Sequence, residues 1–398
     1  MAVLRALALN AGSSTLKAAL YDVEPGAALA GPVAPRWRDG VEWDPTDGAT
    51  VARELLRRVP DEVDVVGHRI VHGGELFHRP QRLTPSVKQA VGALAERAPL
   101  HNAAALRAIA AAEEVTGAGT PQVGVFDTAF HAGLPLPART YAGPREWLDR
   151  GLRRFGFHGI NHEYAAHRAA RLLGRPVGDL RLITCHLGSG CSLAAVRNGR
   201  SVDTTMGFTP LDGLVMSTRS GSLDPGLVLH LLREPGASVD ALHAVLQHAS
   251  GLRGLSGGSG DMRDVLAASA AGDEPARLAL DVYIHRLRSQ IGAMLGALGG
   301  LDAIVFTGGV GENSAEVRSA ALAPLEFLGV RLDPDRNAQA RPDADVAAAG
   351  SSVRVLVVGA REEWAIARAA AKLLAAPSLT YRPSSRGGAR GSSTPRPR

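Results

Sequence analysis

A short glycine-serine turn between two apolar stretches occurs twice in this chain, and the repeat limits the possible folds more than any other feature. Residues 7–20 read LALNAGSSTLKAAL, with the turn at Gly12, and residues 185–196 read CHLGSGCSLAAV. At a fixed offset Gly12 aligns with Gly188. Such a turn can hold phosphate oxygens with its backbone N–H groups. An ordinary β-hairpin explains either turn alone, but the repeat predicts a duplicated fold that closes on one nucleotide.

Strand-like and helix-like stretches alternate in both halves of the chain. Apolar strands are expected at 64–68 and 122–126 in the first half and at 303–307 and 353–358 in the second. This alternation is typical of α/β architecture. A chain of 398 residues is also long enough for two domains with separate cores. Residues 23–50 are rich in proline and glycine, which predicts a loop or irregular strands there.

The distribution of charge excludes a nucleic-acid surface on the folded body. The chain has 44 Lys and Arg against 39 Asp and Glu, but the arginine excess lies in the Pro/Gly/Ser-rich stretch 376–398, which has no acidic residue. We expect this basic tail to be disordered. The rest of the chain is balanced in charge, so we expect no nucleic-acid partner for it.

Cysteine usage and the apolar stretches predict a cytoplasmic protein. Cys185 and Cys191 lack the second ligand pair of a zinc site, so reduced thiols are expected. Arg5 interrupts a short N-terminal apolar run, which argues against a signal peptide. Residues 291–301 are too few and too glycine-rich to cross a bilayer, so no membrane partner is expected.

Glycine-rich turns follow several of the expected strands, near Gly12, Gly188, Gly258 and Gly309. The P-loop motif and the protein-kinase motifs are absent, and GGVGEN at 308–313 is not a dinucleotide-binding fingerprint. Each turn alone is a weak signal. Four of them in one chain predict a nucleotide cleft between two domains.

Cationic and imidazole side chains lie in glycine-flanked loops, at Arg69, His101, His158, His186 and Arg219. Phosphoryl transfer requires fixed positive groups around the equatorial oxygens of the transferred phosphoryl. An arginine that ties loops together, or a histidine satisfied in a core, is the structural alternative for each residue. Five such residues in similar loops favour the catalytic interpretation.

Three oxygen-bearing side chains form a set that suits a metal, Asn10, Asp127 and Glu362. Asp127 directly follows the expected strand 122–126, and α/β sheets place their chemistry at the carboxyl ends of strands. An ATP-using site needs Mg²⁺, which is usually held by one or two protein oxygens together with water and phosphate. Glu362 could instead only stabilise the start of its helix.

Ten motifs, in order over residues 3–375, are similar to those of the acetate kinase family: LNAGSSTLK, GHRIVHGGE, PLHN, VFDTAFH, RFGFHGIN, CHLGSGCS, STRSGSLDP, SGDMRD, FTGGVGEN and REEWAIAR. The resemblance implies two actin-like (ribonuclease H-like) domains with a nucleotide cleft between them, usually in a homodimer. It implies 1–130 as the first domain, joined by the C-terminal helix 364–375, and 131–363 as the nucleotide-binding domain. The implied reaction converts ATP and acetate into ADP and acetyl phosphate.

The resemblance also implies a role for each matched residue. Asn10 and Glu362 would lie at Mg²⁺, with Mn²⁺ as a possible substitute. The other implied site residues fall into three groups: catalytic Asp127, His158 and Arg219; substrate-binding Arg69, Val71, Leu100, Phe157 and Pro210; and nucleotide-binding Lys17, His186, Leu187, Gly188, Ser189, Gly190, Asp261, Met262, Arg263, Gly309, Val310, Gly311, Glu312 and Asn313.

Four positions depart from the family pattern: Ser189, Ser217, Ser222 and Arg361. Members of the family usually have asparagine, glycine, aspartate and asparagine there, so the phosphate contacts and the Arg219 loop are the features affected. Propionate kinase of the same family is an alternative, because the sequence does not give the volume of the pocket. A non-catalytic nucleotide-binding paralogue is the alternative of another class.

The implied reaction needs little proton transfer. A carboxylic acid with a pKa near that of Asp or Glu, about 4, is already ionised at neutral pH. We therefore expect Asp127 to orient Arg69 or Arg219, or to hold a metal-bound water, rather than to act as a base. We also expect Lys17 to contribute more to turnover than to nucleotide affinity.

Overall fold

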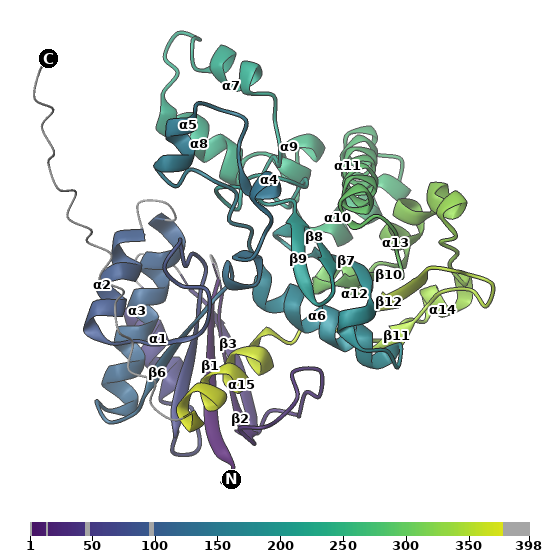
Figure 1. The fold of residues 1–398 in the computed structure, drawn as a ribbon. Helices are drawn as coiled ribbons and strands as arrows, with labels where there is room; N and C mark the ends of the chain where they lie inside the picture. Colours follow the sequence, from purple (N-terminus) through teal and green to yellow (C-terminus); the bar gives the residue numbers. More distant parts are fainter. Residues whose placement is uncertain (1, 13–14, 44–47, 95–98, 377–398) are drawn as a thin grey trace, which may run out of the picture.

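Two six-stranded sheets form the framework of the molecule (Figure 1). The computed structural model describes residues 2–12, 15–43, 48–94 and 99–376. The first sheet consists of β1 (Leu4–Ala11), β2 (Thr15–Val23), β3 (Trp37–Glu42), β4 (Val65–Ile70), β5 (Gln81–Arg82) and β6 (Gln122–Phe126). The second consists of β7 (Arg181–Leu187), β8 (Cys191–Arg197), β9 (Arg200–Thr204), β10 (Ala303–Thr307), β11 (Ala344–Asp345) and β12 (Arg354–Val357).

The two sheets have the same topology. The strand orders are β3-β2-β1-β4-β6-β5 and β9-β8-β7-β10-β12-β11. In each sheet the first three strands pair antiparallel, the next two add in parallel, and a two-residue strand closes the edge antiparallel. The repeated turn joins β1 to β2 and β7 to β8. The expected duplication and the two-domain α/β class are therefore confirmed.

Two helices lie between the sheets, α6 (Gly159–Leu172) and α15 (Glu362–Ala375). One apolar cluster joins Tyr21 of the first sheet, Trp364 of α15, Tyr164 of α6 and Val305 of the second sheet. The last described helix returns to the first sheet, since α15 packs on β1, β2, β4 and β6. A Cβ at Gly67 would lie 2.7 Å from the Ile366 side chain, so a glycine on β4 allows this close contact.

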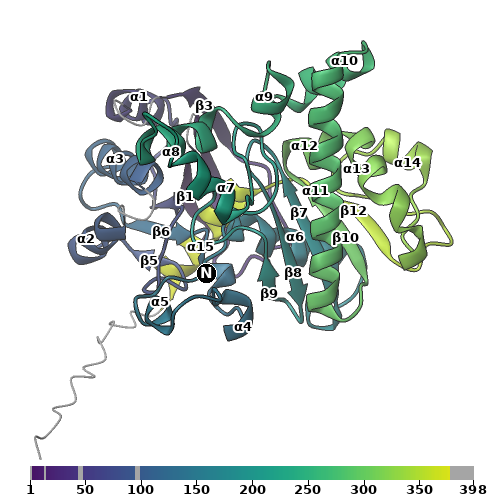
Figure 2. The same cartoon turned by 90° about the horizontal axis from the view of Figure 1, so that it is seen from above.

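Helices also cover the outer face of each sheet. The first sheet packs against α1 (Ala49–Leu56) and α3 (Pro99–Thr116), with α2 (Pro85–Ala93) beside α3. The second packs against the long helix α11 (Glu274–Leu298). Near α11 in Figure 2 are α9 (Gly251–Ser256), α10 (Met262–Ala270), α13 (Ala315–Leu322) and α14 (Pro334–Ala338).

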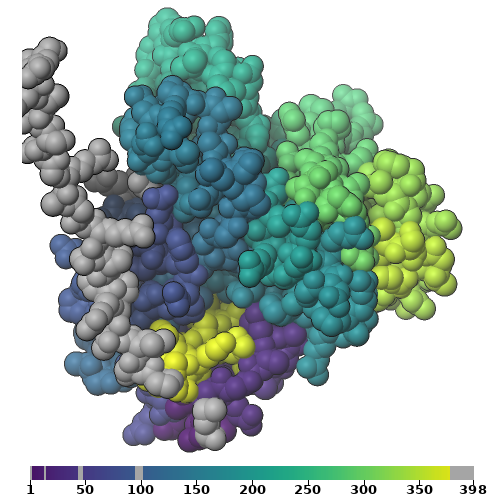
Figure 3. Space-filling view, viewed as in Figure 1, coloured from purple at the N-terminus to yellow at the C-terminus, as the bar shows by residue number. Residues whose placement is uncertain are grey.

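A projection extends from the second half of the molecule, at the top of Figures 1 and 3. It includes α7 (Pro225–Leu231) and α8 (Val239–His248), neither of which has a buried residue. The short helices α4 (Leu136–Arg139) and α5 (Arg145–Asp149) also lie in the upper part of Figure 1. No helix in the described ranges is both long enough and apolar enough to span a membrane.

Two details differ from the sequence-based expectations, and a third expectation concerns residues outside the described ranges. Residues 37–42, within a stretch expected to be irregular, form the regular strand β3. The glycine-rich stretch 308–313 forms a short helix, α12 (Gly308–Asn313), rather than an open loop. The predicted disorder of the basic tail concerns residues 377–398, which lie outside the described residues.

Candidate active site

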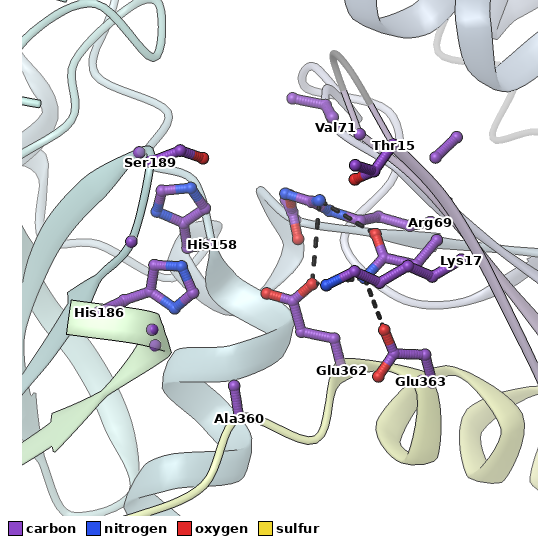
Figure 4. Close-up of a pocket in the computed structure, with 18 of the residues that line it drawn as sticks. Thr15, Lys17, Arg69, Val71, His158, His186, Ser189, Ala360, Glu362 and Glu363 are labelled. Carbon is purple, nitrogen blue, oxygen red and sulfur yellow. Dashed lines mark hydrogen bonds and ion pairs between the residues drawn. The ribbon is translucent and has the colours of Figure 1, made fainter. Parts of the chain in front are cut away.

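A cavity of about 780 Å³ lies between the two halves of the molecule. The carboxyl ends of β1, β4 and β6 form one side, and the repeated turn after β7 and the start of α12 form the other (Figure 4). The cavity collects most of the residues implied by the sequence: Asn10, Lys17, Arg69, Val71, Asp127, Phe157, His158, His186, Gly188, Ser189, Gly190, Pro210, Arg219, Gly309, Glu312 and Glu362.

The remaining implied residues whose side chains the structure describes do not line the cavity. Four are packed in or beside the core of the second half: Leu187, Met262, Val310 and Gly311. Asp261 caps α10 and pairs with Arg263 at 2.6 Å. The Asn313 amide donates to the Gly309 carbonyl, so it supports the shape of the α12 segment. The side chains of Leu100 and His101 lie outside the described residues.

Arg69, on β4, is the centre of a charged cluster on the first side of the cavity. Its Nε and Nη2 lie 2.8 and 2.7 Å from Asp127 Oδ2. Its Nη1 donates to Asn10 Oδ1 at 3.1 Å and lies 3.8 Å from Glu362 Oε2. The Arg69 side chain is only 14% exposed, and opposite charges on two sides compensate for its burial.

Asp127 is fully buried at the end of β6. Burial raises its pKa to about 6, although Arg69 acts in the opposite direction; the nearby Glu362 charge adds to the increase. The carbonyl of Asp127 also accepts from the Gly159 amide at the start of α6. Asp127 is therefore held from both its backbone and its side chain, and its described ionic partner is Arg69.

Glu362 is the carboxylate that best suits a metal. Burial opposes its ionisation, but Arg69 and a hydrogen bond from Asn10 lower its pKa below the ordinary value. The Asn10 amide donates to Glu362 Oε2 at 2.7 Å and to Glu363 Oε1 at 3.3 Å. Within the described ranges, no three His, Cys, Asp or Glu side chains gather into a metal centre. One ionised carboxylate facing a cavity fits Mg²⁺ that takes its other ligands from water and phosphate.

Two imidazoles face the charged cluster from the second side of the cavity. The rings of His158 and His186 stack with centroids 4.3 Å apart. Burial and the neighbouring imidazole hold the pKa of His158 well below its ordinary value, and burial lowers that of His186. Both rings are therefore neutral at pH 7. His158 has a φ of 57°, in the left-handed region, directly before α6.

The loop that carries Arg219 has Ser222 where members of the family usually have aspartate. Arg219 donates to the Pro210 carbonyl at 3.2 Å, and its pKa is lowered by burial. The Ser222 hydroxyl instead binds Asp212 at 2.5 Å. A second departure, Ser217, donates its amide to the Ser189 carbonyl at 3.2 Å, so this loop and the repeated turn are joined through their backbones.

The cavity also has apolar lining residues. Val71, Phe157 and Pro210 line it, and Val71 and Phe157 are both buried. Because Arg219 donates to the carbonyl of Pro210, this apolar wall lies beside a cation. The arrangement suits a short acyl chain whose carboxylate faces positive charge.

Sequence reasoning missed several residues of the cavity. Arg38, Asp39 and Gly40 line it from β3, and Glu363 lies 3.5 Å from Arg38. These three residues were not predicted because the stretch that forms β3 was expected to be a loop or irregular strands. Glu312 accepts from the amides of Gly308 and Ala360, and this joins α12 to the segment that leads into α15.

Comparisons with known proteins agree with this geometry. A model of the acetokinase family matches residues 49–368. Acetate kinase from Gloeobacter violaceus is 50% identical, over 92% of this chain and 98% of that protein, and the one from Nostoc sp. is 48% identical over the same shares. Among solved structures, acetate kinase from Porphyromonas gingivalis has a TM-score of 0.83 at 36% identity, covering 93% of this chain and 100% of that one. A propionate kinase from Francisella tularensis has a TM-score of 0.81 at 33% identity, covering 93% and 99%. The chain therefore belongs to the acetokinase family.

Proposed function

We propose that this chain transfers the γ-phosphoryl group of MgATP reversibly to acetate, giving acetyl phosphate and ADP. The observation that carries the proposal is the buried Arg69–Asp127 pair, which faces two neutral imidazoles and Arg219 across one cavity. ATP and ADP are the co-substrates of the family. The paralogue without catalytic activity is disfavoured, because the charged residues that phosphoryl transfer requires line the cavity together.

Arg69 and Asp127 would bind the acceptor, and His158 and Arg219 would stabilise the transferred phosphoryl group. Acetate is ionised at neutral pH, so Arg69 binds a carboxylate rather than a neutral acid. Of the roles considered for Asp127, orientation of Arg69 has the best support, since two Arg69 nitrogens lie within 2.8 Å of one of its oxygens. Arg219 then neutralises charge on the equatorial phosphoryl oxygens, and the neutral His158 ring donates a hydrogen bond to them.

Glu362 would hold Mg²⁺, or Mn²⁺, and Asn10 would keep Glu362 in place. The Asn10 amide hydrogens are directed to Glu362 and Glu363, while its oxygen accepts from Arg69. Asn10 therefore links the carboxylate of the metal site to the arginine of the substrate site. When bound, the cation would neutralise the phosphate oxygens of the nucleotide.

Acetate is the first candidate among short acids, and propionate is the second. Val71, Phe157 and Pro210 are apolar lining residues, which supports a short acyl chain, and a relative that is 50% identical is an acetate kinase. The similarity to the propionate kinase from Francisella tularensis keeps the second candidate open. One methylene changes discrimination by only about 1–3 kcal/mol, so the two acids must be compared directly.

We also propose a cytoplasmic homodimer. Apolar side chains of α7 and α8 are exposed on the projection, with Leu229 54% and Val239 71% exposed. A second copy of this chain would cover such a patch. The free thiols of Cys185 and Cys191 suit a reducing compartment. In each copy, 1–130 with 364–375 and 131–363 would be the two domains.

A hydroxamate assay tests the function. The protein is incubated with MgATP, hydroxylamine and acetate, propionate or butyrate, and the trapped acyl phosphate is measured. We expect the highest kcat/KM for acetate. A higher value for propionate would assign the chain as a propionate kinase, and no acyl phosphate with any acid would refute the kinase proposal.

A further inference from the structure

A series of hydrogen bonds leads from His158 away from the cavity into the second half of the molecule. His158 Nδ1 lies 2.9 Å from Ser192 Oγ, Ser192 Oγ lies 2.7 Å from His162 Nε2, and His162 Nδ1 lies 2.7 Å from Thr184 Oγ1. Ser192, on β8, His162, on α6, and Thr184, on β7, are fully buried. A side chain of the cavity is thus bonded to three groups that do not line it.

The protons in this series can be arranged in two directions, because each hydroxyl both donates and accepts. In one direction His158 donates from Nδ1 to Ser192, which leaves a lone pair on Nε2. In the other, Thr184 donates to His162, His162 to Ser192, and Ser192 to His158, which places the His158 proton on Nε2. The three bonds form in both directions. The longer hydrogen bond from the Thr184 hydroxyl to the Ala194 carbonyl, at 3.4 Å, forms only in the first direction.

The direction matters because Nε2 of His158 is the nitrogen on the cavity side. A Cβ added to Gly190, which lines the cavity, would lie 3.2 Å from this nitrogen. A lone pair at Nε2 would repel a phosphoryl oxygen, whereas an N–H would donate to it. A doubly protonated ring would also donate, but burial and nearby imidazole and arginine groups disfavour that form.

We propose that Ser192, His162 and Thr184 are positioning residues that keep His158 neutral, with its proton on Nε2, when a phosphoryl group occupies the cavity. The inference rests on the proposed function, since it assigns a role to His158 in phosphoryl transfer. The series lets His158 donate to an anion without the cost of burying another positive charge beside Arg69 and Arg219.

Two other histidines show what is distinctive about His158. His131 Nε2 lies 3.0 Å from the Phe157 carbonyl, which can only accept, so the proton of His131 is fixed on Nε2. His186 Nδ1 accepts from the Asn161 amide at 2.8 Å, which also fixes its proton on Nε2. In His158 alone among these three, hydroxyl groups decide the tautomer.

Isosteric variants test the role of the series. Thr184→Val and Ser192→Ala each remove one hydroxyl, and Thr184→Ser restores the first. We expect kcat to fall about tenfold or more in Thr184→Val and Ser192→Ala, up to the ~10²–10³ that the loss of one transition-state donor costs, while KM for ATP and acetate is unchanged. Thr184→Ser should recover wild-type kcat. Ser201→Ala is the matched control, because Ser201 binds His131 Nδ1 at 2.8 Å and should leave kcat unchanged.

The tautomer itself is measured by ¹⁵N NMR of histidine-labelled protein with MgADP, acetate and aluminium fluoride, and His158→Gln assigns the signal. We expect the His158 proton on Nε2 in the wild type. A proton on Nδ1, a doubly protonated ring, or wild-type kcat in both hydroxyl variants would overturn the inference. If both variants fail to fold, the wild-type spectrum decides alone. A wild type that makes no acyl phosphate would instead refute the proposed function.

Discussion

The two halves of the molecule share one strand order but place different chemistry at the cavity. Asn10 and His186 occupy the same position in the repeated turn, two residues before Gly12 and Gly188. On the first side the cavity is lined by five charged residues, Lys17, Arg38, Asp39, Arg69 and Asp127, and α15 adds the carboxylates of Glu362 and Glu363. On the second side, among the described residues, imidazoles, glycines and serine predominate, and Arg219 and Glu312 are the charged members.

This difference shows how a duplicated framework can perform two tasks. Under the proposed function, the charged side would hold the carboxylate, the metal and the acceptor end of the reaction. The side with glycines exposes backbone amides and neutral rings, which suit a nucleotide and its phosphates. In the account proposed here, transfer takes place where the two sides meet, between Arg69 and His158. Each prediction below alters one side and leaves the other intact.

The largest effect is expected from Arg69→Ala on the charged side. The change removes the cation that binds the acceptor carboxylate and leaves Asp127 buried without its partner. We expect kcat/KM for acetate to fall by ~10³–10⁵, the range found when an arginine is removed from a phosphoryl-transfer site. Steady-state rates in the hydroxamate assay measure this. Arg69→Lys is the matched control and should be poorly active, since lysine lacks the fork that binds Asp127 and Asn10 together.

The next effect is a pH dependence that comes from Asp127. Its pKa is raised to about 6, so its carboxyl becomes protonated as the pH falls through that value and no longer orients Arg69 as an anion. We expect kcat/KM for acetate to be constant above this pH and to fall below it. In Asp127→Asn the rate should be lower, by about 10²-fold, and this acid limb should disappear. An acid limb at the same pH in Asp127→Asn would contradict the assignment.

Lys17→Ala should have a smaller effect, again on the charged side. Lys17 lines the cavity on β2, on the charged side, and lies near Glu362 in Figure 4. We expect kcat to fall by ~10–10², less than the ~10²–10³ that removal of one oxyanion-hole donor costs, with ADP affinity unchanged. Rates and titration calorimetry with ADP measure the two quantities. An equal loss in both would place Lys17 on the nucleotide instead.

Gly309→Ala should have the smallest effect and the opposite pattern. Gly309 lines the cavity on the other side, and an added Cβ would meet no atom within 4 Å, so the fold should tolerate it. The methyl group would occupy space next to the nucleotide. We expect ADP affinity to weaken by a few-fold, about 1 kcal/mol, with little change in kcat at saturating ATP. A fall in kcat with normal ADP affinity would reverse the division between the two sides.

Much of this arrangement could be predicted because glycine turns and polar residues follow the strands closely in sequence. The turn at Gly12 and its repeat at Gly188 predict the duplication, and Asp127 directly after an apolar strand predicts its place in the cavity. Arg38 was missed because β3 lies in a stretch rich in proline and glycine, and its pairing with β2 depends on the rest of the sheet. Ser192 was missed for another reason: a buried hydroxyl within an apolar strand has no pattern of its own.

Contacts between segments far apart in the chain could not be predicted from the sequence either. The Asn10 amide reaches Glu362 and Glu363 only because α15, at the far end of the chain, packs on β1. The departures from the family pattern became interpretable in the same way. Ser222 binds Asp212 rather than Arg219, so the loop keeps its position through other bonds.

The most direct test of the account follows the phosphoryl group itself by ³¹P NMR. The purified protein is mixed with MgATP, and spectra are recorded before and after acetate is added. We expect the γ-phosphate resonance to decrease and an acetyl phosphate resonance to grow with ADP, only when acetate is present. Release of inorganic phosphate without an acyl phosphate resonance, or no change on addition of acetate, would contradict the account.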